Sequence, residues 1–308
     1  MTDSPRSGRR RWLLMAIAAL LVLAPLTLGV VYLTGSQKAV EADSRARELV
    51  MLGGNPGPVS RVGRLRVVVA DLGLASQSRP DAPRWLDRDS YADAVHTLGR
   101  EVAVSRADVV VLYDVLFDGY RASGIPTAER IAVEAELPWR VEVNLWNRRF
   151  AMHPLFKPSE WAREVVGGVV VLSRFPIVRH TVETFPPAPS DMAWAPHRGL
   201  VRLVIQTGPD QEHVLEVVDR GEAGEPTGGD GLGSLHVRRM DGLQNGIEPN
   251  RVATDGLELV WGGPATAVLA QNRTRFHDNL RDPVILVELS VPAGAEPTEA
   301  EDPNPTDP

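Results

Sequence analysis

Two segments of this chain are nearly continuous runs of apolar residues, and each run ends at an aspartate. The first is RLRVVVADLGL, with the apolar part from Leu65 to Asp71, and the second is RADVVVLYDV, from Arg106 to Val115. A strand whose apolar residues do not alternate with polar ones is buried on both faces. The two runs therefore predict strands in the interior of a sheet, with Asp71 and Asp114 at their ends.

Helical patterns separate the early strands. DSYADAVHTLGREVAV starts like a capping box and places its apolar residues on one helical face, and PTAERIAVEAEL has Pro126 near its start. WRVEVNLW then reads as a strand, VVGGVVVLSRFPIVRHTVETF as two strands around a turn, and GLVRLVIQT, EHVLEVV, LELVW, TAVLAQ and PVILVELSV as further strands. This order predicts an α/β (α+β) fold in which two sheets pack together with helices on their outer faces.

The N-terminal segment carries the strongest signal for location. WLLMAIAALLVLAPLTLGVVYL, from Trp12 to Leu33, is an uncharged run of about 22 residues, and a membrane-spanning helix needs roughly 20. A cleaved signal peptide is the competing interpretation, but its apolar region is usually shorter and ends in a small-residue cleavage site. Because arginines precede the run, we expect a single-pass anchor in the cell membrane, with the N-terminus cytoplasmic and the rest extracytoplasmic.

Composition shifts divide the chain into four parts. We expect a basic stub and transmembrane anchor at 1–34, a linker at 35–58, a folded domain at 59–292, and a disordered acidic tail at 293–308. Within the domain, the segment 219–256 is glycine-rich. A phosphate-binding loop would need a strand before it and a helix after it, and GGDGLGS has the strand at most, so the segment is predicted to be a mobile loop.

Residue counts narrow the possible functions. The chain has no cysteine, which excludes disulfides, thiolate zinc sites and a cysteine nucleophile. It has 33 basic and 40 acidic residues and a net charge of −7, so the totals show no basic footprint for a nucleic-acid backbone. Nucleic acid is therefore a poor first candidate for a partner, and the expected ligand is an unidentified protein or phosphoester.

The order of the apolar segments resembles a known family. RLRVVVADLG, ADVVVLYDV, GGVVVLSRFPI, HRGLVRLVI with EHVLEVVD, and RDPVILVEL follow one another as in the endonuclease/exonuclease/phosphatase family, over nearly all of Leu65 to Val291. GGVVVLSRFPI is the most specific match. The resemblance implies a four-layered α/β sandwich that hydrolyses phosphoesters with a divalent metal ion, Mg²⁺ or Mn²⁺, held by oxygen ligands.

The resemblance also implies positions for the metal ligands. Asp71 stands where the family has asparagine, and Tyr113 and Asp114 stand where it has a Gln-Glu pair. Asp219 replaces the histidine of a Thr-His-Leu motif. The three aspartates are therefore candidates for binding Mg²⁺, Mn²⁺ or Ca²⁺, with Tyr113 in the same pocket; the alternative is that they are solvated ends of strands.

The late motifs match less well. LELVW aligns either with the strand of the Gly-Asp-Phe-Asn motif or, with better spacing, with an Ile-Asp-Tyr strand that makes Glu258 a further metal ligand. No histidine falls at a catalytic position of the family, although His277 with Asp278 lies near the late motif and a loop shift would bring the pair in. Arg198 stands where the family pattern often shows an arginine that braces the site or the sheet.

Two functional hypotheses follow. In the first, the chain is a membrane-anchored, catalytically impaired member of the fold that serves as a binding or scaffold module. In the second, it is a divergent metal-dependent phosphoesterase that uses Asp71, Asp114, Asp219 and the His277–Asp278 pair. Loss of positioned proton transfer typically costs about 10² to 10⁴ in rate, which favours the first hypothesis.

Overall fold

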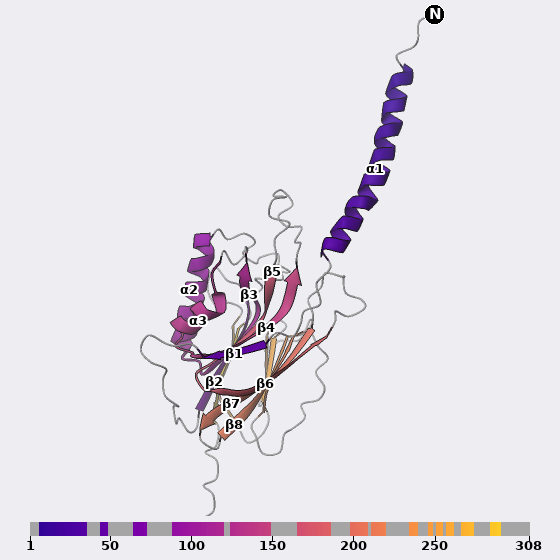
Figure 1. Ribbon diagram of the computed structural model, residues 1–308. Helices are drawn as coiled ribbons and strands as arrows, with labels where there is room; N and C mark the ends of the chain where they lie inside the picture. The colour runs from indigo at the N-terminus through magenta and orange to yellow at the C-terminus, as the bar shows by residue number, and fades with distance from the viewer. Residues whose placement is uncertain are drawn as a thin grey trace, which may run out of the picture.

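The computed structural model describes the helices and strands of the chain and a few of the turns between them (Figure 1). The described residues are 6–35, 44–48, 64–72, 88–119, 124–148, 165–185, 198–208, 211–219, 234–239, 246–248, 251–254, 257–261, 266–273 and 284–290.

Two seven-stranded sheets form the body of the domain. Sheet A contains, in spatial order, β1 (Ser44–Glu48), β4 (Trp139–Arg148), β5 (Val165–Ser173), β3 (Val109–Gly119), β2 (Arg64–Asp71), β14 (Val284–Ser290) and β13 (Thr266–Arg273). Sheet B contains β10 (Gly246–Glu248), β11 (Arg251–Thr254), β12 (Leu257–Trp261), β9 (Ser234–Arg239), β8 (Gln211–Asp219), β7 (Arg198–Gly208) and β6 (Ile177–Phe185).

Sheet A is covered on both faces. Helices α2 (Arg88–Ser105) and α3 (Thr127–Glu134) pack against each other, and α3 also packs on β3 and β4 (Figure 1). The central residues of β2 and β3 are fully buried as a result, which confirms the two interior strands predicted from their apolar runs. Helices α2 and α3 lie on sheet A, so the described residues show three of the four layers that the resemblance implied.

Sheet B turns one face toward sheet A. Along β8 the buried residues His213, Leu215 and Val217 alternate with partly exposed ones, which is the pattern of a strand with one face in the core. β12 packs against β2 and β14 of sheet A. The main core therefore lies between the two sheets, with a second apolar layer between sheet A and the helices.

Each sheet has one parallel pair among its described strand pairings. β2 runs parallel to β3 in sheet A, and β8 runs parallel to β9 in sheet B, whereas the other pairings are antiparallel. The carboxyl ends of parallel strands meet at one edge, where ligand sites of α/β sheets are usually built. Asp71, Asp219 and Arg239 are the last residues of β2, β8 and β9.

Two segments differ from the sequence-based expectation. Residues 35–58, predicted to be a linker, include β1, which pairs with β4 and extends the edge of sheet A. The prediction that 219–256 is a mobile loop was wrong, because this segment contains β9, β10 and β11. SLHVRR forms β9, which pairs with both β8 and β12. The apolar–polar alternation of this strand is short, and the glycines around it made the whole segment resemble a loop.

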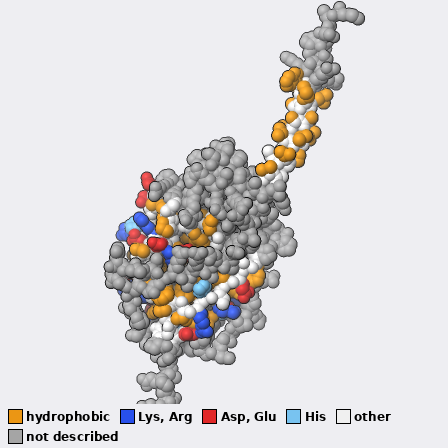
Figure 2. Space-filling view, viewed as in Figure 1, with side chains coloured by type: hydrophobic (Ala, Val, Ile, Leu, Met, Phe, Trp, Pro, Cys, Tyr) orange, Lys and Arg blue, Asp and Glu red, His pale blue; other side chains and the backbone are white. Residues whose placement is uncertain are grey.

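The N-terminal run forms α1 (Arg6–Gly35), and its hydrophobic side chains are exposed, as the orange atoms of Figure 2 show. Trp12, for example, is 73% exposed. Within the described residues, however, no helix combines the length and the apolar character that crossing a membrane requires. The membrane anchor therefore stays a prediction from the sequence.

Candidate functional site

A β-bulge brings Asp114 toward sheet B. The pairing of β3 with β5 slips between Leu112 and Val115, and Asp114 has a left-handed backbone with a φ of 57°. In a regular strand, Tyr113 and Asp114 would point to opposite faces, but a bulge re-aims a side chain. Both residues interact with groups of sheet B, so the strained conformation of Asp114 gives this edge a second polar group.

Arg239 lies among three buried aspartates. Its Nε is 2.9 Å from Oδ2 of Asp71, its Nη1 is 3.6 Å from Oδ1 of Asp219, and its Nη2 is 3.9 Å from Oδ2 of Asp114. The aspartate side chains are 5% exposed or less, and that of Arg239 is 9% exposed. We call these four residues the aspartate–arginine cluster.

The surrounding charges keep Arg239 protonated. Burial by itself lowers the pKa of its guanidinium, but the charges of Asp71, Asp219 and Asp114 outweigh burial and raise the pKa above its ordinary value. A buried ion pair gains stability only where its geometry offsets the cost of desolvation. Because Asp71 makes the short contact, this pair is the strongest link in the cluster.

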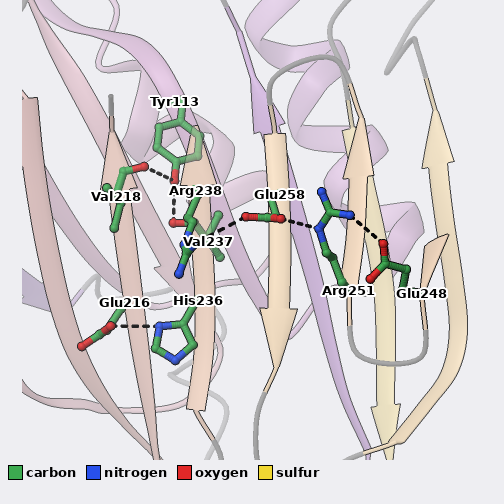
Figure 3. A network of polar contacts seen from close by, with 9 residues as sticks. All are labelled: Tyr113, Glu216, Val218, His236, Val237, Arg238, Glu248, Arg251 and Glu258. Carbon is green, nitrogen blue, oxygen red and sulfur yellow. Dashed lines mark hydrogen bonds and ion pairs between the residues drawn. The ribbon is translucent and has the colours of Figure 1, made fainter. Parts of the chain in front are cut away.

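Tyr113, next to Asp114 on β3, forms hydrogen bonds with the backbone of sheet B close to the cluster. Its hydroxyl donates toward the carbonyl oxygens of Val218, at 3.1 Å, and of Val237, at 3.2 Å, which belong to β8 and β9 (Figure 3). Burial, and then the charge of Asp219, raise the pKa of Tyr113 well above its ordinary value. The tyrosine is therefore a neutral donor that joins sheet A to the parallel pair of sheet B.

The cluster fits a divalent ion poorly. The resemblance implies a divalent metal ion held by oxygen ligands, and Asp71, Asp114 and Asp219 do come together around Arg239. The guanidinium of Arg239, however, already lies between their oxygens, where a cation would have to bind. Among the described residues, no group of three or more acidic, histidine or cysteine side chains is arranged to hold a metal ion.

Other residues proposed from the alignment lie elsewhere. Glu258 is on the outer face of sheet B, where it pairs with Arg251 and is 3.7 Å from Arg238, and Arg251 in turn pairs with Glu248 (Figure 3). The alternation of β12 explains this correction, because Leu257 and Leu259 take the inward positions.

Three predicted residues stay untested. Arg198 is the first residue of β7 and pairs with Phe185, but its side chain is not among those described. His277 and Asp278 lie outside the described residues. Of the histidines that are described, His236 pairs with Glu216 on the outer face of sheet B, at 2.9 Å (Figure 3).

Arg239 was missed by sequence reasoning. The signal for it was the alternation of SLHVRR, in which the buried positions Leu235, Val237 and Arg239 share one face of β9. An arginine at the third inward position of a short strand needs a buried acidic partner. Asp71, Asp114 and Asp219 are those partners. The inward position of Arg239 in SLHVRR could therefore have predicted a buried acidic cluster next to β9.

A polar cavity of about 730 Å³ lies at the other end of sheet A. It is lined by residues that include Arg64, Arg66, Arg106, Asp108, Arg174 and Glu288. Its charges largely pair with one another, since Arg64 and Arg66 both bind Glu288 and Arg174 lies 3.6 Å from Asp108. The walls of the cavity thus carry a network of ion pairs, and this network is separate from the aspartate–arginine cluster.

Comparisons with known proteins identify the fold. No protein-family model and no curated protein matches the sequence. Among solved structures, the endonuclease/exonuclease/phosphatase from Beutenbergia cavernae matches with a TM-score of 0.52 and 13% identity, over 75% of this chain and 72% of its own.

Two further structures are similar at lower scores. The human nocturnin catalytic domain with bound sulfate anion has a TM-score of 0.45 and 12% identity, over 80% of this chain and 97% of its own. An endonuclease/exonuclease/phosphatase family protein from Leptotrichia buccalis has a TM-score of 0.45 and 10% identity, over 74% and 100%. The match to the Beutenbergia cavernae structure, with its TM-score of 0.52, confirms the predicted fold: the chain has the endonuclease/exonuclease/phosphatase fold.

Proposed function

We propose that this chain is a non-catalytic binding or scaffold domain with the endonuclease/exonuclease/phosphatase fold. The observation that carries the proposal is the position of Arg239. Its three guanidinium nitrogens each face a carboxylate oxygen of Asp71, Asp114 or Asp219. The groups that would have to hold a catalytic cation are therefore engaged by a side chain of the protein itself.

Electrostatics supports the same conclusion. Three carboxylates and one guanidinium carry a formal charge of −2, which repels the negatively charged oxygens of a phosphoester. A divalent cation in place of the guanidinium would reduce the net charge to −1 and would polarise the phosphoryl oxygen. Arg239 cannot supply this as it lies, because it is only 9% exposed and faces the aspartates.

The cluster also lacks a suitable general acid or base among its described residues. Asp219 stands where the resemblance places a histidine, and Tyr113 commits its hydroxyl to the carbonyls of Val218 and Val237. An efficient general acid or base has a pKa near the working pH. The pKa of Tyr113 is instead raised well above its ordinary value of 10.0, which removes this group as an acid or base at neutral pH.

The alternative is a divergent metal-dependent phosphoesterase. It is favoured by the fact that three carboxylates lie together at the edge where the two parallel pairs end. For this function, Arg239 would have to leave the cluster when the metal ion enters. Such a movement would break the 2.9 Å contact with Asp71 and expose three like charges to one another.

A hydrolysis assay distinguishes the two. The full chain is incubated with bis-p-nitrophenyl phosphate and with p-nitrophenyl phosphate, in Mg²⁺, in Mn²⁺ and in EDTA. We expect release of nitrophenol no faster than in the matched buffer. Metal-dependent release that is lost in Asp114→Ala would overturn the proposal, and activity that Asp114→Ala retains would point to a contaminant.

We further propose that α1 tethers the domain to the cell membrane. The support is the uncharged run from Trp12 to Leu33 and the exposure of its apolar side chains. Fractionation of cells tests this: the full chain should stay with membranes after alkaline carbonate extraction, and a chain lacking residues 1–35 should be released. Recovery of the full chain in the soluble fraction would contradict the tether.

A further inference from the structure

β6 is the outermost described strand of sheet B (Figure 1). It pairs with β7 along one edge, and no described strand pairs with its other edge. Every second residue of such a strand points its N–H and C=O groups away from the sheet, where they can pair with another chain. Along β6 only Ile177 is buried, and the residues that follow are partly or fully exposed. The free edge of β6 can therefore accept a further strand.

The charged side chains of β6 are placed symmetrically about Thr181. Arg179 lies two residues before it and Glu183 two residues after it, so the three side chains share one face of the strand. This is the outer face of sheet B, because their partners on β7 alternate with Val201 and Leu203, which are buried in the core.

This symmetry makes the strand complementary to itself. When two copies of one strand pair antiparallel about a two-fold axis at Thr181, residue 179 of each copy lies opposite residue 183 of the other. Each Arg179 then faces a Glu183, and this contact occurs twice in the interface. Opposite charges directly across an antiparallel pair stabilise it.

We propose that β6 is the contact between two copies of this chain, which pair antiparallel with Thr181 opposite Thr181. Sheet B then continues from one copy into the other. Among the symmetric pairings that keep the outer faces together, only the one centred on Thr181 sets Arg179 against Glu183. The inference is independent of the proposed function, because none of these residues belongs to the aspartate–arginine cluster.

The surroundings of the two charges leave them able to make this contact. Glu183 is exposed and forms no ion pair within the part of the chain that the structure describes. Arg179 pairs with Glu212 of β8, but the arginine side chain is 69% exposed, and ion pairs at the surface are weak. A glutamate from a second copy can therefore share or replace Glu212 as the partner of this arginine.

Charges on an edge strand can also serve to keep other strands away. That protection works when the charges have one sign, because like charges then meet in every pairing of two copies. In β6 the charges have opposite signs, and the strand also exposes Val178 and Phe185, by 42% and 39%. The pattern of β6 is therefore better suited to pairing with a copy than to protecting a free edge.

A pairing over Arg179 to Glu183 makes a small interface, so the test has to trap the paired state. The chain has no cysteine, which makes trapping by a disulfide specific. Thr181→Cys and Thr184→Cys are introduced separately into the full chain, which is oxidised with copper phenanthroline in mild detergent. Thr181 is exposed, so its replacement leaves the core intact.

The two cysteine positions differ in the distance between the copies. Residues 181 lie directly opposite each other, with Cα atoms about 4.5 to 5.5 Å apart, which a disulfide can span. Residues 184 lie about 20 Å apart along the paired strands, because each is opposite residue 178 of the other copy. Thr181→Cys should therefore form a linked dimer on a non-reducing gel, and Thr184→Cys should form about tenfold less.

Charge reversal tests the register. Glu183→Arg and Arg179→Glu each set like charges against one another, so each should trap about tenfold less dimer in the Thr181→Cys background. A mixture of the two variants restores opposite charges at both contacts and should trap the mixed dimer, identified by a longer tag on one variant. Thermal unfolding checks that each variant is folded, and Glu183→Arg is the cleaner of the two because it leaves the pair of Arg179 with Glu212 intact.

Three outcomes would overturn the inference. They are no trapping through residue 181, equal trapping through residues 181 and 184, and a mixture that traps no more dimer than its two variants do separately. None of these measurements uses a phosphoester. Hydrolysis by the wild type would refute the proposed function without bearing on the pairing of β6.

Discussion

Asp219 and Arg239 lie directly opposite each other in the parallel register of β8 and β9, with 3.6 Å between Oδ1 of the aspartate and Nη1 of the arginine. The same arginine reaches across to sheet A, where its Nε is 2.9 Å from Asp71. One side chain thus joins a neighbour in its own sheet to a partner in the other sheet. Loss of either contact should therefore weaken the packing of sheet A against sheet B.

The first prediction ranks the aspartates. Asp71→Asn should lower the free energy of unfolding by about 1.5 to 3 kcal/mol, because it removes the short, charge-assisted contact with Arg239. Asp114→Asn should lower it less than Asp71→Asn does, because Oδ2 of Asp114 is 3.9 Å from Nη2 of Arg239 and asparagine tolerates φ above zero. Urea unfolding of both variants checks the order, and equal effects would contradict the assigned geometry.

The second prediction concerns high pH. Burial raises the pKa of Tyr91 to about 12, although its hydrogen bond to Thr127 works in the opposite direction. A raised pKa means that the folded state keeps the proton when the unfolded state has begun to lose it. The stability that Tyr91 contributes is therefore constant below pH 10 and is lost between about pH 10 and pH 12.

Substitution of Tyr91 tests this. Wild-type stability should fall between about pH 10 and pH 12, and Tyr91→Phe should show a shallower fall in the same range. At neutral pH the variant should be weakened by about 1 kcal/mol through loss of the 2.6 Å hydrogen bond with Thr127. The same slope in the wild type and in Tyr91→Phe would show that this hydroxyl is not protected.

The third prediction concerns Gly168 on β5. A Cβ built on this residue would lie 2.0 Å from the carbonyl oxygen of Val143, so the backbone of β4 would have to move. Gly168→Ala should therefore cost about 3 kcal/mol or more, or prevent folding. Gly208→Ala is the matched control, because its Cβ would make only ordinary contacts with Gln211 and should cost about 0.5 kcal/mol or less. Equal stability of the two variants would rule out the close approach.

The fourth prediction concerns the ends of the two helices. Arg106 and Glu136 follow α2 and α3 with φ values of 52° and 54°. This is the left-handed conformation that glycine adopts without strain. Arg106→Gly and Glu136→Gly should each raise the free energy of unfolding by about 0.5 to 1 kcal/mol. Glu101→Gly, inside α2, should lower it by a similar amount, and destabilisation by all three would contradict the assigned helix ends.

The interior strands were predictable because burial on both faces leaves a continuous apolar run. RLRVVVAD and RADVVVLYDV became β2 and β3, and their aspartates lie in one cluster. The left-handed turn at Asp114 was not predictable, because a bulge depends on the neighbouring strand and leaves no mark in its own sequence. The role of Arg239 was not predicted because its strand is short and lies in a glycine-rich segment.

Glu258 illustrates the opposite error. The alignment gave it a site role on spacing alone, whereas the alternation of LELVW assigns Leu257 and Leu259 to the core and turns Glu258 outward toward Arg251. The period of a strand is a local physical constraint, and it outweighs an alignment that has to cross unmatched loops.

Because β1 belongs to the edge of sheet A, only a short segment of chain separates the folded domain from α1. Helix α1 ends at Gly35 and β1 begins at Ser44. The chain between them spans at most about 30 Å when fully extended. A domain of about 200 residues is comparably wide, with a radius of gyration of roughly 16 Å. If α1 tethers the domain as proposed, the β1 side of sheet A faces the surface that holds α1, and the opposite side of the domain stays open to a partner.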